Sequence, residues 1–304
     1  MAGADPLHVC YVLIANGWDR HARMMWLSAT SLRLHEPNAR ITLVTDRESR
    51  DTFERSAPQL LGLIDEVVTV DTSIADRRLR AFGLKTSFRC HVKGDVLYLD
   101  GDTLVVGRLR DVFDVQGDVA AALDFNHDGE WFPPQLRDSY TALGWPYPLP
   151  YYFNSGVLML RDTPAVRAFS EEWTRRWLLL VEQGMPGDQE AFVSALYAMP
   201  VKWARLAKGF NAIVVKRNYR FREARVLHFF GSLAEQRGTL MEHLLAHLGE
   251  TGEFDSRAYW RSLKQGHPWG PRAEPWQLWR SRNYVRAIVV KARLALARTL
   301  RLSR

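Results

Sequence analysis

Cysteine is scarce in this chain and long apolar runs are absent, and each shortage excludes a class of protein. Two cysteines, Cys10 and Cys90, are too few for the disulfide framework of a secreted domain. Their apolar neighbours predict buried thiols in a reducing compartment. No stretch approaches the roughly 18 uncharged apolar residues that cross a membrane, and residues 1–7 lack the basic start and apolar core of a secretory signal. We therefore expect a cytoplasmic protein.

Three common phosphate-binding or catalytic motifs are missing as well. The sequence has no G-x-G of a dinucleotide-binding turn, no P-loop and no G-x-S-x-G nucleophile elbow. His243 and His247 have a spacing that can bind zinc on a helix, but Leu244 stands where a metalloprotease has its glutamate. We interpret the two as ordinary helix histidines.

The excess of positive charge is confined to the end of the chain. The 304 residues carry a net charge of +7, and a composition of 47% hydrophobic and 25% charged residues is typical of a globular protein. Residues 275–304 contain eight cations and no acid, and without these eight, 33 basic and 34 acidic residues remain. A body that binds nucleic acid usually carries its own basic stripe, so we expect no nucleic-acid partner.

Strand and helix signals alternate along the first third of the chain. Continuous apolar runs, as at residues 8–14, are typical of strands that are buried on both faces of a sheet. This order of elements favours an α/β fold with a mostly parallel central sheet flanked by helices. Ligands of such sheets bind beyond the carboxyl ends of the strands. The patterns predict further strands at 40–45, 64–70, 95–99 and 157–160, and helices at 24–34, 84–92 and 188–198.

Residues 126–152 do not continue the alternation of strands and helices. They contain five prolines and seven aromatic residues. Large apolar side chains in a long loop indicate either a lid or binding surface, or a loop that packs on the domain. The sequence leaves both interpretations open. If the segment is a lid or a binding surface, the candidate platforms on which an acceptor sugar would stack are Trp131, Trp145 and Tyr147.

An acidic pair follows the strand predicted at residues 95–99. Asp100 and Asp102 form the only D-x-D sequence in the chain. Two carboxylates at the end of a buried strand repel each other, and a bound cation removes that cost. Oxygen ligands suit Mg²⁺ or Mn²⁺, and Mg²⁺ commonly completes its shell with substrate phosphates. The alternative is a pair of aspartates that cap a turn.

Four segments of the chain, at residues 97–105, 153–160, 187–192 and 227–231, resemble in this order the motifs of nucleotide-sugar glycosyltransferases of family 8, such as glycogenin and the lipopolysaccharide galactosyltransferases. Residues 97–105 (LYLDGDTLV) resemble the D-x-D strand of that family, and residues 153–160 (FNSGVLML) its F-N-[SA]-G-V strand. Residues 187–192 (GDQEAF) resemble its D-Q-[DE] helix start, and residues 227–231 (LHFFG) its H-x-x-G segment. The resemblance covers about residues 7–232 and implies the GT-A fold and transfer of a sugar from a UDP-sugar.

The resemblance implies a metal site and implies which residues bind the metal. Asp100 and Asp102 would bind Mn²⁺ or Mg²⁺, with Asp100 also near the ribose of the donor. His228 would be the third ligand, and imidazole nitrogen is compatible with Mn²⁺. The alternative for His228 is a buried structural histidine.

The resemblance also implies residues that act on the donor sugar. Asn154 would contact the donor sugar or the acceptor; the alternative is an asparagine that holds a turn. Asp188 would bind sugar hydroxyls, and Gln189 would lie beside the anomeric carbon. The alternative is a helix start, since Asp188 is a good N-cap and Glu190 suits a first helical turn, and both interpretations can hold together.

Further donor contacts are implied more loosely. The family holds the uracil ring after its first strand, a donor-binding lysine before the D-x-D segment, and an acid on a sugar hydroxyl after a later strand. The alternative for the donor-binding lysine is a helix lysine exposed to solvent. A [WF]-N pair, matched by residues 210–211, precedes the H-x-x-G segment. The corresponding donor-binding candidates are Ile14, Ala15, Asn16, Lys85, Asp124 and Gly231.

One departure from the family concerns the diphosphate. The family continues its H-x-x-G segment to a lysine that neutralises the diphosphate, whereas Ala234 stands at that position here. Another cation must then replace it, or activity is reduced. The candidates are Lys85, Lys208, Arg217, Arg222 and Arg225.

Members of this family retain the anomeric configuration of the donor. Retaining glycosidases use a carboxylate nucleophile, but the residue expected here is Gln189, a poor nucleophile. The resemblance therefore implies displacement on the front face of the sugar, with the departing phosphate acting as base.

The basic C-terminal segment has an apolar stripe at helical spacing. Val285, Ile288, Val289, Ala292 and Leu296 lie on one face of a predicted helix bordered by arginines. Such a helix suits the surface of an anionic membrane; the alternative is a helix docked on the domain. We predict a GT-A catalytic domain over residues 1–235 and a helical extension over residues 236–304 that can place the protein on the inner face of a membrane.

The function predicted from these observations is a metal-dependent glycosyltransferase acting on a glycan or glycolipid acceptor. Two other functions stay open. A catalytically silent protein that binds sugar nucleotides or glycans is compatible with the missing lysine. A sugar nucleotidyltransferase has a related fold but carries a glycine- and lysine-rich loop after its first strand, where this chain has only Gly17.

Overall fold

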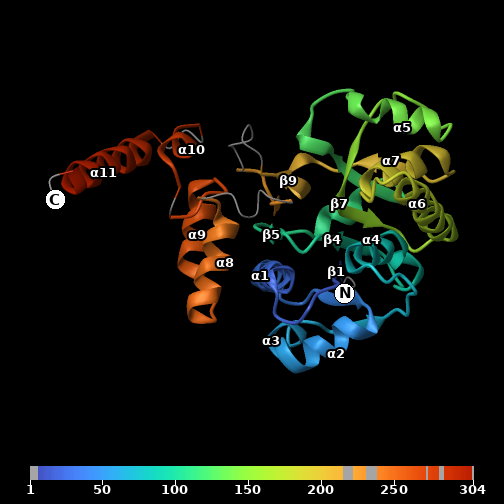
Figure 1. Cartoon of the computed structure of the whole chain (residues 1–304), viewed down its shortest axis with the longest axis horizontal. Coiled ribbons are helices and arrows are strands. Elements are labelled where there is room, and N and C mark those ends of the chain that lie inside the picture. The colour runs from blue at the N-terminus through green and yellow to red at the C-terminus, as the bar shows by residue number, and fades with distance from the viewer. Residues whose placement is uncertain (1–5, 215–221, 231–237, 272, 281–283, 303–304) are drawn as a thin grey trace, which may run out of the picture.

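A computed structural model of the chain describes residues 6–214, 222–230, 238–271, 273–280 and 284–302. The described residues form one large and one small sheet, with helices around them (Figure 1). The large sheet has seven strands. In their order across the sheet these are β3 (Glu66–Thr69), β2 (Arg40–Thr45), β1 (His8–Val12), β4 (Val96–Leu99), β7 (Phe153–Leu160), β6 (Val119–Leu123) and β8 (Trp203–Arg205).

Pairing in the large sheet is parallel except along β7. β1 pairs in parallel with β2 and β4, β2 with β3, and β6 with β8. β7 runs antiparallel to its neighbours β4 and β6. The predicted α/β fold with a mostly parallel sheet is therefore confirmed. Because β7 is reversed, its first residues lie at the edge of the sheet where β1 and β4 end.

Helices bury both faces of the sheet, as the apolar runs predicted. Tyr11 and Leu43 belong to a core beneath α1, α2 and α3, whereas their neighbours Cys10 and Val44 belong to a second core beneath α4, α6 and α7. The helices of these two layers are α1 (Arg20–His35), α2 (Arg47–Ser56), α3 (Pro58–Leu61), α4 (Arg77–Ser87), α6 (Pro164–Glu182) and α7 (Gln189–Ala198).

Side-chain caps set where the helices begin, and they explain the differences from the predicted bounds. α1 begins four residues before the predicted helix at 24–34, because the carboxylate of Asp19 accepts hydrogen bonds from the first free amides. α4 begins seven residues before the predicted helix at 84–92, because Asp76 caps it through the amide of Leu79. The earlier start of α4 matters for the site, since it adds Arg77 and Arg78 to the helix.

The C-terminal helices share a third core with the small sheet. β10 (Val226–His228) runs antiparallel to β5 (Thr103–Val105) and parallel to β9 (Ala212–Ile213). Apolar side chains of these strands, of α1 and of the C-terminal helices form this core. None of the described helices is both long and apolar enough to cross a bilayer. The division of the chain near residue 235 stays a prediction. The C-terminal helices are α8 (Leu240–Thr251), α9 (Ser256–Gln265), α10 (Pro275–Arg280) and α11 (Tyr284–Leu302).

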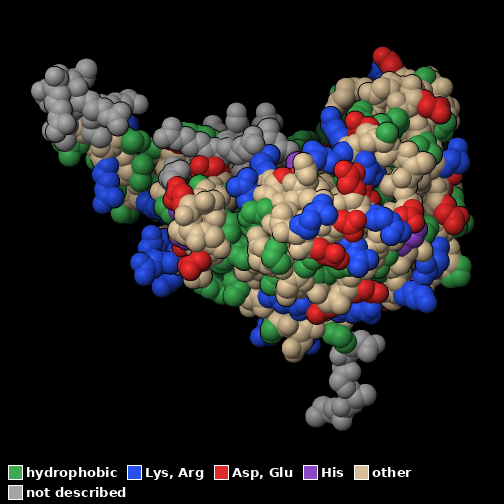
Figure 2. Space-filling view, turned by 60° about the horizontal axis from the view of Figure 1, so that its bottom comes forward, with side chains coloured by type: hydrophobic (Ala, Val, Ile, Leu, Met, Phe, Trp, Pro, Cys, Tyr) green, Lys and Arg blue, Asp and Glu red, His purple; other side chains and the backbone are tan. Residues whose placement is uncertain are grey.

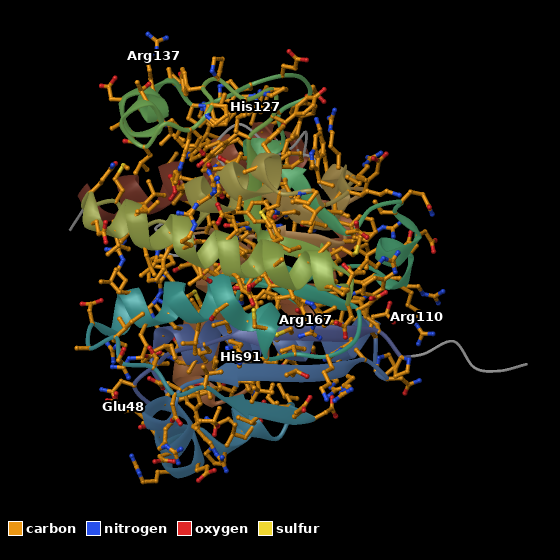
Figure 3. The ribbon with its side chains drawn as sticks, turned by 90° about the vertical axis from the view of Figure 1, so that its right-hand side faces the viewer. Glu48, His91, Arg110, His127, Arg137 and Arg167 are labelled. Atoms are coloured by element: carbon orange, nitrogen blue, oxygen red, sulfur yellow. The ribbon has the colours of Figure 1, made fainter. Side chains whose placement is uncertain are left out.

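Much of the segment 126–152 packs on the domain, as one of its two interpretations predicted. The segment contains the short helix α5 (Arg137–Ala142), and His127 and Arg137 mark it in Figure 3. Tyr140 and Trp145 belong to the same core as α6 and α7. Trp145 is therefore wrong as a platform for a sugar: its ring is buried and is covered by the guanidinium of Arg176.

Candidate functional site

Asp100 and Asp102 lie in the turn between β4 and β5, at the carboxyl end of β4 as predicted. The amide of Asp100 donates to the carbonyl of Gly156 at 2.8 Å, which fixes this turn to the start of β7. The Tyr98 hydroxyl donates to Asp100 Oδ1 at 2.5 Å. Burial raises the pKa of Asp100, and the charge of Lys85 only partly offsets this increase. A carboxyl group in this position benefits from a cation beside it.

His228 is the last residue of β10, and the pairing of β10 with β5 brings it to the two aspartates. Its Nε2 lies 3.3 Å from Asp102 Oδ1 and 3.9 Å from Asp100 Oδ2. One ligand atom from each of these three residues lies within 4.8 Å of the others. Burial opposes protonation of His228, but the carboxylates of Asp102 and Asp100 outweigh it and raise its pKa. Burial likewise acts to raise the pKa of Asp102, yet His228 holds it below its usual value.

The donor atoms of this cluster fit a divalent cation. Asp102 Oδ1 and His228 Nε2 are both buried and, apart from their contact of 3.3 Å with each other, have no hydrogen-bond partner within the described chain. Buried polar atoms without a partner are costly, and a cation bound between them removes this cost. Gly156 leaves room beside them, because a methyl group there would overlap His228 Cε1 and lie 2.7 Å from Asp100 Oδ2. Two carboxylates and one imidazole form a ligand set that a divalent cation accepts.

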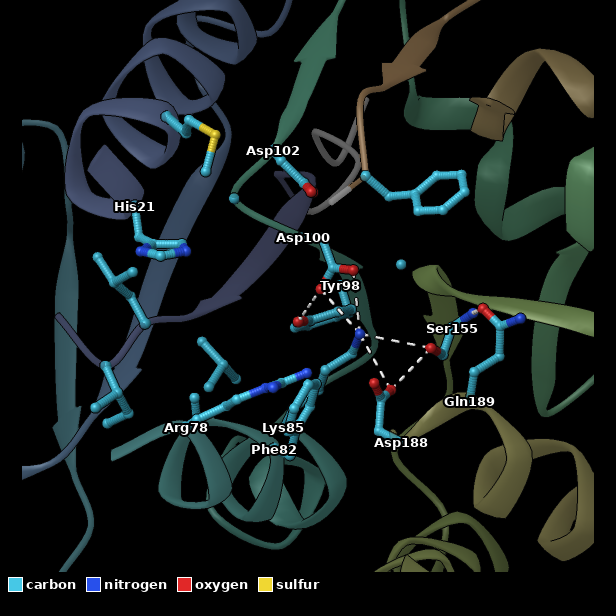
Figure 4. A pocket seen from close by; sticks show the side chains of 18 of the residues that line it. His21, Arg78, Phe82, Lys85, Tyr98, Asp100, Asp102, Ser155, Asp188 and Gln189 are labelled. Atoms are coloured by element: carbon cyan, nitrogen blue, oxygen red, sulfur yellow. Dashed lines mark hydrogen bonds and ion pairs between the residues drawn. The ribbon is translucent and has the colours of Figure 1, made fainter. Parts of the chain in front are cut away.

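Lys85 of α4 is buried between two carboxylates (Figure 4). Its Nζ lies 3.0 Å from Asp100 Oδ1 and 3.1 Å from Asp188 Oδ2, and 3.5 Å from the hydroxyl of Ser155. Burial lowers the pKa of Lys85, but the two carboxylates outweigh it and the net shift is upward. The structure therefore excludes the solvated helix lysine that the sequence left open.

Asp188 stands at the N-cap position of α7, but its side chain makes no capping hydrogen bond. Instead its Oδ2 accepts a hydrogen bond of 2.8 Å from Ser155 Oγ and pairs with Lys85. Gln189 Oε1 accepts hydrogen bonds from Asn154 Nδ2 at 3.0 Å and from the amide of Ser155 at 3.3 Å. The start of α7 is thus bound to the start of β7 through side chains.

Asp124 follows β6 at a β-bulge, where the register between β6 and β7 shifts. The shift pairs Leu123 with Phe153, and Asp124 Oδ1 accepts a hydrogen bond of 3.0 Å from Asn154 Nδ2. Burial raises the pKa of Asp124, an effect that this hydrogen bond only partly offsets.

These residues line one cavity of about 710 Å³. Ala15 and Asn16 do not contribute to its lining: Ala15 is buried against Ser49, and the amide of Asn16 donates to Asp19. Gly231, like Ala234, is outside the described residues. Of the predicted site residues, the cavity brings together Ile14, Lys85, Asp100, Asp102, Asp124, Asn154, Asp188, Gln189 and His228.

The cavity wall also contains cations that sequence reasoning missed. Arg77 and Arg78, in the first turn of α4, line the cavity together with His21 of α1. Arg78, Phe82 and Lys85 are spaced i, i+4 and i+7 and share one face of α4. This spacing was the available signal, because it projects the first turn of α4 to the same side as Lys85.

Most of the cations considered as replacements for the missing lysine lie elsewhere. Lys208 pairs with the exposed Asp128, and Arg225 pairs with Asp111. Neither of them lines the cavity, and nor does Arg222. Arg217 is outside the described residues. Among the candidates that the structure describes, only Lys85 lies in the cavity.

The sequence matches no family model and no curated protein. Solved structures do match it. The galactosyltransferase LgtC, solved in complex with donor and acceptor sugar analogues, is 16% identical with a TM-score of 0.53, and the match covers 84% of this chain and 100% of LgtC. The apo form of the glycosyltransferase GlyE from Streptococcus pneumoniae TIGR4 is 16% identical with a TM-score of 0.50, over 88% of this chain and 66% of GlyE. The chain therefore has the GT-A fold of these glycosyltransferases, as its sequence motifs predicted.

Proposed function

We propose that the chain is a metal-dependent glycosyltransferase that transfers a sugar from a UDP-sugar to a glycan or glycolipid acceptor. The observation that carries this proposal is the convergence of Asp100, Asp102 and His228 in the cavity that also contains Lys85 and Asp188. The fold supports the choice of substrates, because LgtC was solved with analogues of a donor and an acceptor sugar.

Asp100, Asp102 and His228 would hold the cation, Mn²⁺ or Mg²⁺. When bound, it supplies Lewis-acid neutralisation of the diphosphate that leaves the donor. Arg77 and Arg78 supply further positive charge from the first turn of α4, where the helix dipole also favours an anion. In this proposal these arginines compensate for the missing lysine at residue 234.

In this proposal Lys85 and Asp188, which both line the cavity, bind sugar hydroxyls, since Lys85 can donate hydrogen bonds and Asp188 can accept them. Asp124, which accepts a hydrogen bond from Asn154, offers a second carboxyl group in the cavity. These groups would hold the sugar ring, and pocket shape around them would select the sugar.

Transfer breaks the bond between the anomeric carbon and the β-phosphate oxygen and forms a bond from that carbon to the acceptor oxygen. The proton of the acceptor hydroxyl passes to the departing phosphate oxygen. Gln189 is neutral and is held by Asn154 and Ser155, so it is unsuited to form a covalent intermediate. We therefore propose retention through displacement on the front face, which NMR of the new linkage tests directly.

An exposed aromatic residue beside the cavity is a candidate contact for the acceptor. Phe125 is 41% exposed, and its ring lies edge-on to Phe230, which lines the cavity. Phe125 and Asn126 both have positive φ angles of 50° and 53°, which costs about 1–3 kcal/mol for each non-glycine residue. Asn126 holds this conformation through hydrogen bonds to the backbone of Asn211 and Ile213. Strain concentrated next to a site is typical of functional positions.

The C-terminal helix supports a further proposal, attachment to an anionic membrane. α11 packs on the molecule through Ala287 and Val290, whereas Val285, Ile288 and Leu296 of the predicted stripe are 76%, 59% and 63% exposed. Hydrophobic and cationic side chains lie side by side on the described part of this helix (Figure 2). An exposed apolar stripe bordered by cations suits binding at the surface of an anionic bilayer.

The experiment that tests the proposed function is thermal melting with UDP, with Mn²⁺, with both, and with both plus EDTA. A ligand at 100 times its dissociation constant stabilises the folded state by about 2.7 kcal/mol. We expect a shift that requires UDP and metal together and that Asp102→Asn abolishes. Binding without transfer from any UDP-sugar would favour the silent binding protein, and no shift with any nucleotide would contradict the proposal.

A further inference from the structure

Asn211 is fully buried and does not line the cavity, yet its side-chain amide connects two residues that do. It lies at the end of a 3₁₀ turn (Lys208–Asn211) that precedes β9. One end of the amide is 2.8 Å from Asn154 Oδ1 and the other is 3.0 Å from His228 Nδ1. Which end of this amide is the oxygen and which is the NH₂ group decides which nitrogen of His228 carries a proton.

The direction of the neighbouring amide is fixed by a backbone group. The N–H of Gly156 can only donate, and it lies 2.9 Å from one end of the Asn154 amide. That end must be the oxygen, so the other end is the NH₂ group. The NH₂ group has acceptors for both of its protons, Asp124 Oδ1 and Gln189 Oε1, each at 3.0 Å. This assignment holds whether or not Asp124 is protonated.

The same reasoning extends to His228. Because Asn154 presents its oxygen to Asn211, Asn211 must present its NH₂ group in return. Its oxygen then faces His228 Nδ1, which must carry a proton in order to donate to it. The lone pair of the neutral imidazole is left on Nε2, and Nε2 is the nitrogen that lies between the carboxylates of Asp100 and Asp102.

We infer that Asn211 is a positioning residue, which acts with Asn154 to fix His228 in the tautomer that can bind a cation through Nε2. The inference rests on the metal site of the proposed function. In this inference the Asn154 amide serves to orient Asn211. That amide already uses both of its donors and accepts two hydrogen bonds within the protein. Residues that orient metal-binding histidines typically contribute a factor of about 10–100 to metal affinity.

NMR of the metal-free protein with labelled histidine tests the inference without any activity. We expect a slowly exchanging ring proton of His228 on Nδ1 in the wild-type protein, and loss of this protection in Asn211→Leu, which keeps the side-chain volume but removes both hydrogen bonds. An unprotonated Nδ1 that accepts a hydrogen bond from Asn211 would overturn the inference. Because this readout needs no metal and no nucleotide, it decides the inference even if the proposed function fails.

Mn²⁺ affinity in the presence of UDP, measured from the EPR signal of the free ion, supplies the second readout. Asn211→Leu should weaken binding by about 10–100-fold, whereas Asn211→Asp keeps an acceptor for the Nδ1 proton and should retain most of the affinity. Equal losses in both variants, in proportion to their lower melting temperatures, would show a structural role only and contradict the inference. If Asn211→Leu does not fold, Asn211→Asp and the wild-type NMR spectrum still decide it.

Discussion

The backbone of Gly156 lies so close to His228 that no side chain fits between them. A methyl group at this position would overlap Cε1 of the imidazole and would also approach Asp100 Oδ2. Glycine is therefore required here by space and not by backbone conformation. Both neighbours belong to the candidate metal site, so a change at Gly156 acts directly on the ligands.

Gly156→Ala should abolish the joint stabilisation by UDP and Mn²⁺, because it displaces His228 and Asp100 from one another. The measurement is the melting temperature with and without both ligands. Gly129→Ala is a matched control, since a methyl group at Gly129 meets no atom within 4 Å. An unchanged ligand-dependent shift in Gly156→Ala would show that the metal does not bind at this cluster.

Lys85→Met should destabilise the metal-free protein by about 3–5 kcal/mol, the usual cost of removing one partner of a buried ion pair. It leaves Asp100 and Asp188 buried without their cation. Urea unfolding with EDTA present measures the effect. Lys208→Met provides the comparison, because Lys208 and its partner Asp128 are exposed and the loss of this pair should change stability little. Equal effects in the two variants would contradict the burial argument.

Acid should destabilise the C-terminal region through His267. Burial lowers the pKa of His267 from 6.5 to about 4, and the nearby Arg286 acts in the same direction. A depressed pKa means that the unfolded state binds the proton more readily. The contribution of neutral His267 is therefore complete above pH 6.5 and is lost as the pH falls from 6.5 towards 4.

This loss amounts to about 3 kcal/mol at 1.36 kcal/mol per pKa unit. The measurement is unfolding at pH 7 and at pH 4.5, compared with His267→Asn, which keeps an acceptor for the amide of Trp269. The variant should lose less stability between the two pH values than the wild-type protein. An equal loss in both would assign the acid sensitivity to other groups.

Replacing the exposed stripe of α11 should release the protein from anionic vesicles. We expect Ile288→Ser with Leu296→Ser to reduce co-sedimentation at least about tenfold, because each side chain gains roughly 1.5–3 kcal/mol on burial in lipid. Leu34→Ser with Leu178→Ser is the control, since these leucines are also exposed but lie on α1 and α6. Binding should also fall at high salt. Equal binding by all three proteins would refute membrane attachment through α11.

The sequence predicted the parts of the site that depend on local order and missed those that depend on packing. Asp100 and Asp102 directly follow an apolar strand, so their place at its carboxyl end could be predicted. His228 came from the family resemblance, because only the pairing of β10 with β5 brings it to the aspartates.

Roles that depend on long-range contacts gave no local signal: residues 210–211 matched the [WF]-N pair of the family, but nothing in the sequence showed what Asn211 contacts. Asn211 acts through contacts with residues 57 and 17 positions away in the sequence. Trp145 was misread because the pattern of residues 126–152 does not distinguish an exposed aromatic ring from one that packs beneath a guanidinium.

The pairing of β7 with β4 ties the geometry of the candidate metal site to the register of the sheet. Val157 pairs with Leu99 and Leu158 with Tyr98, and this register places Gly156 opposite Asp100. A slip of one residue would move a side chain into the space beside His228 and turn the buried residues of β7 to the wrong face. The pairing of the four apolar residues 157–160 therefore sets the geometry of the candidate metal site. Variants that loosen their packing should weaken cation binding at this cluster before they lose the fold.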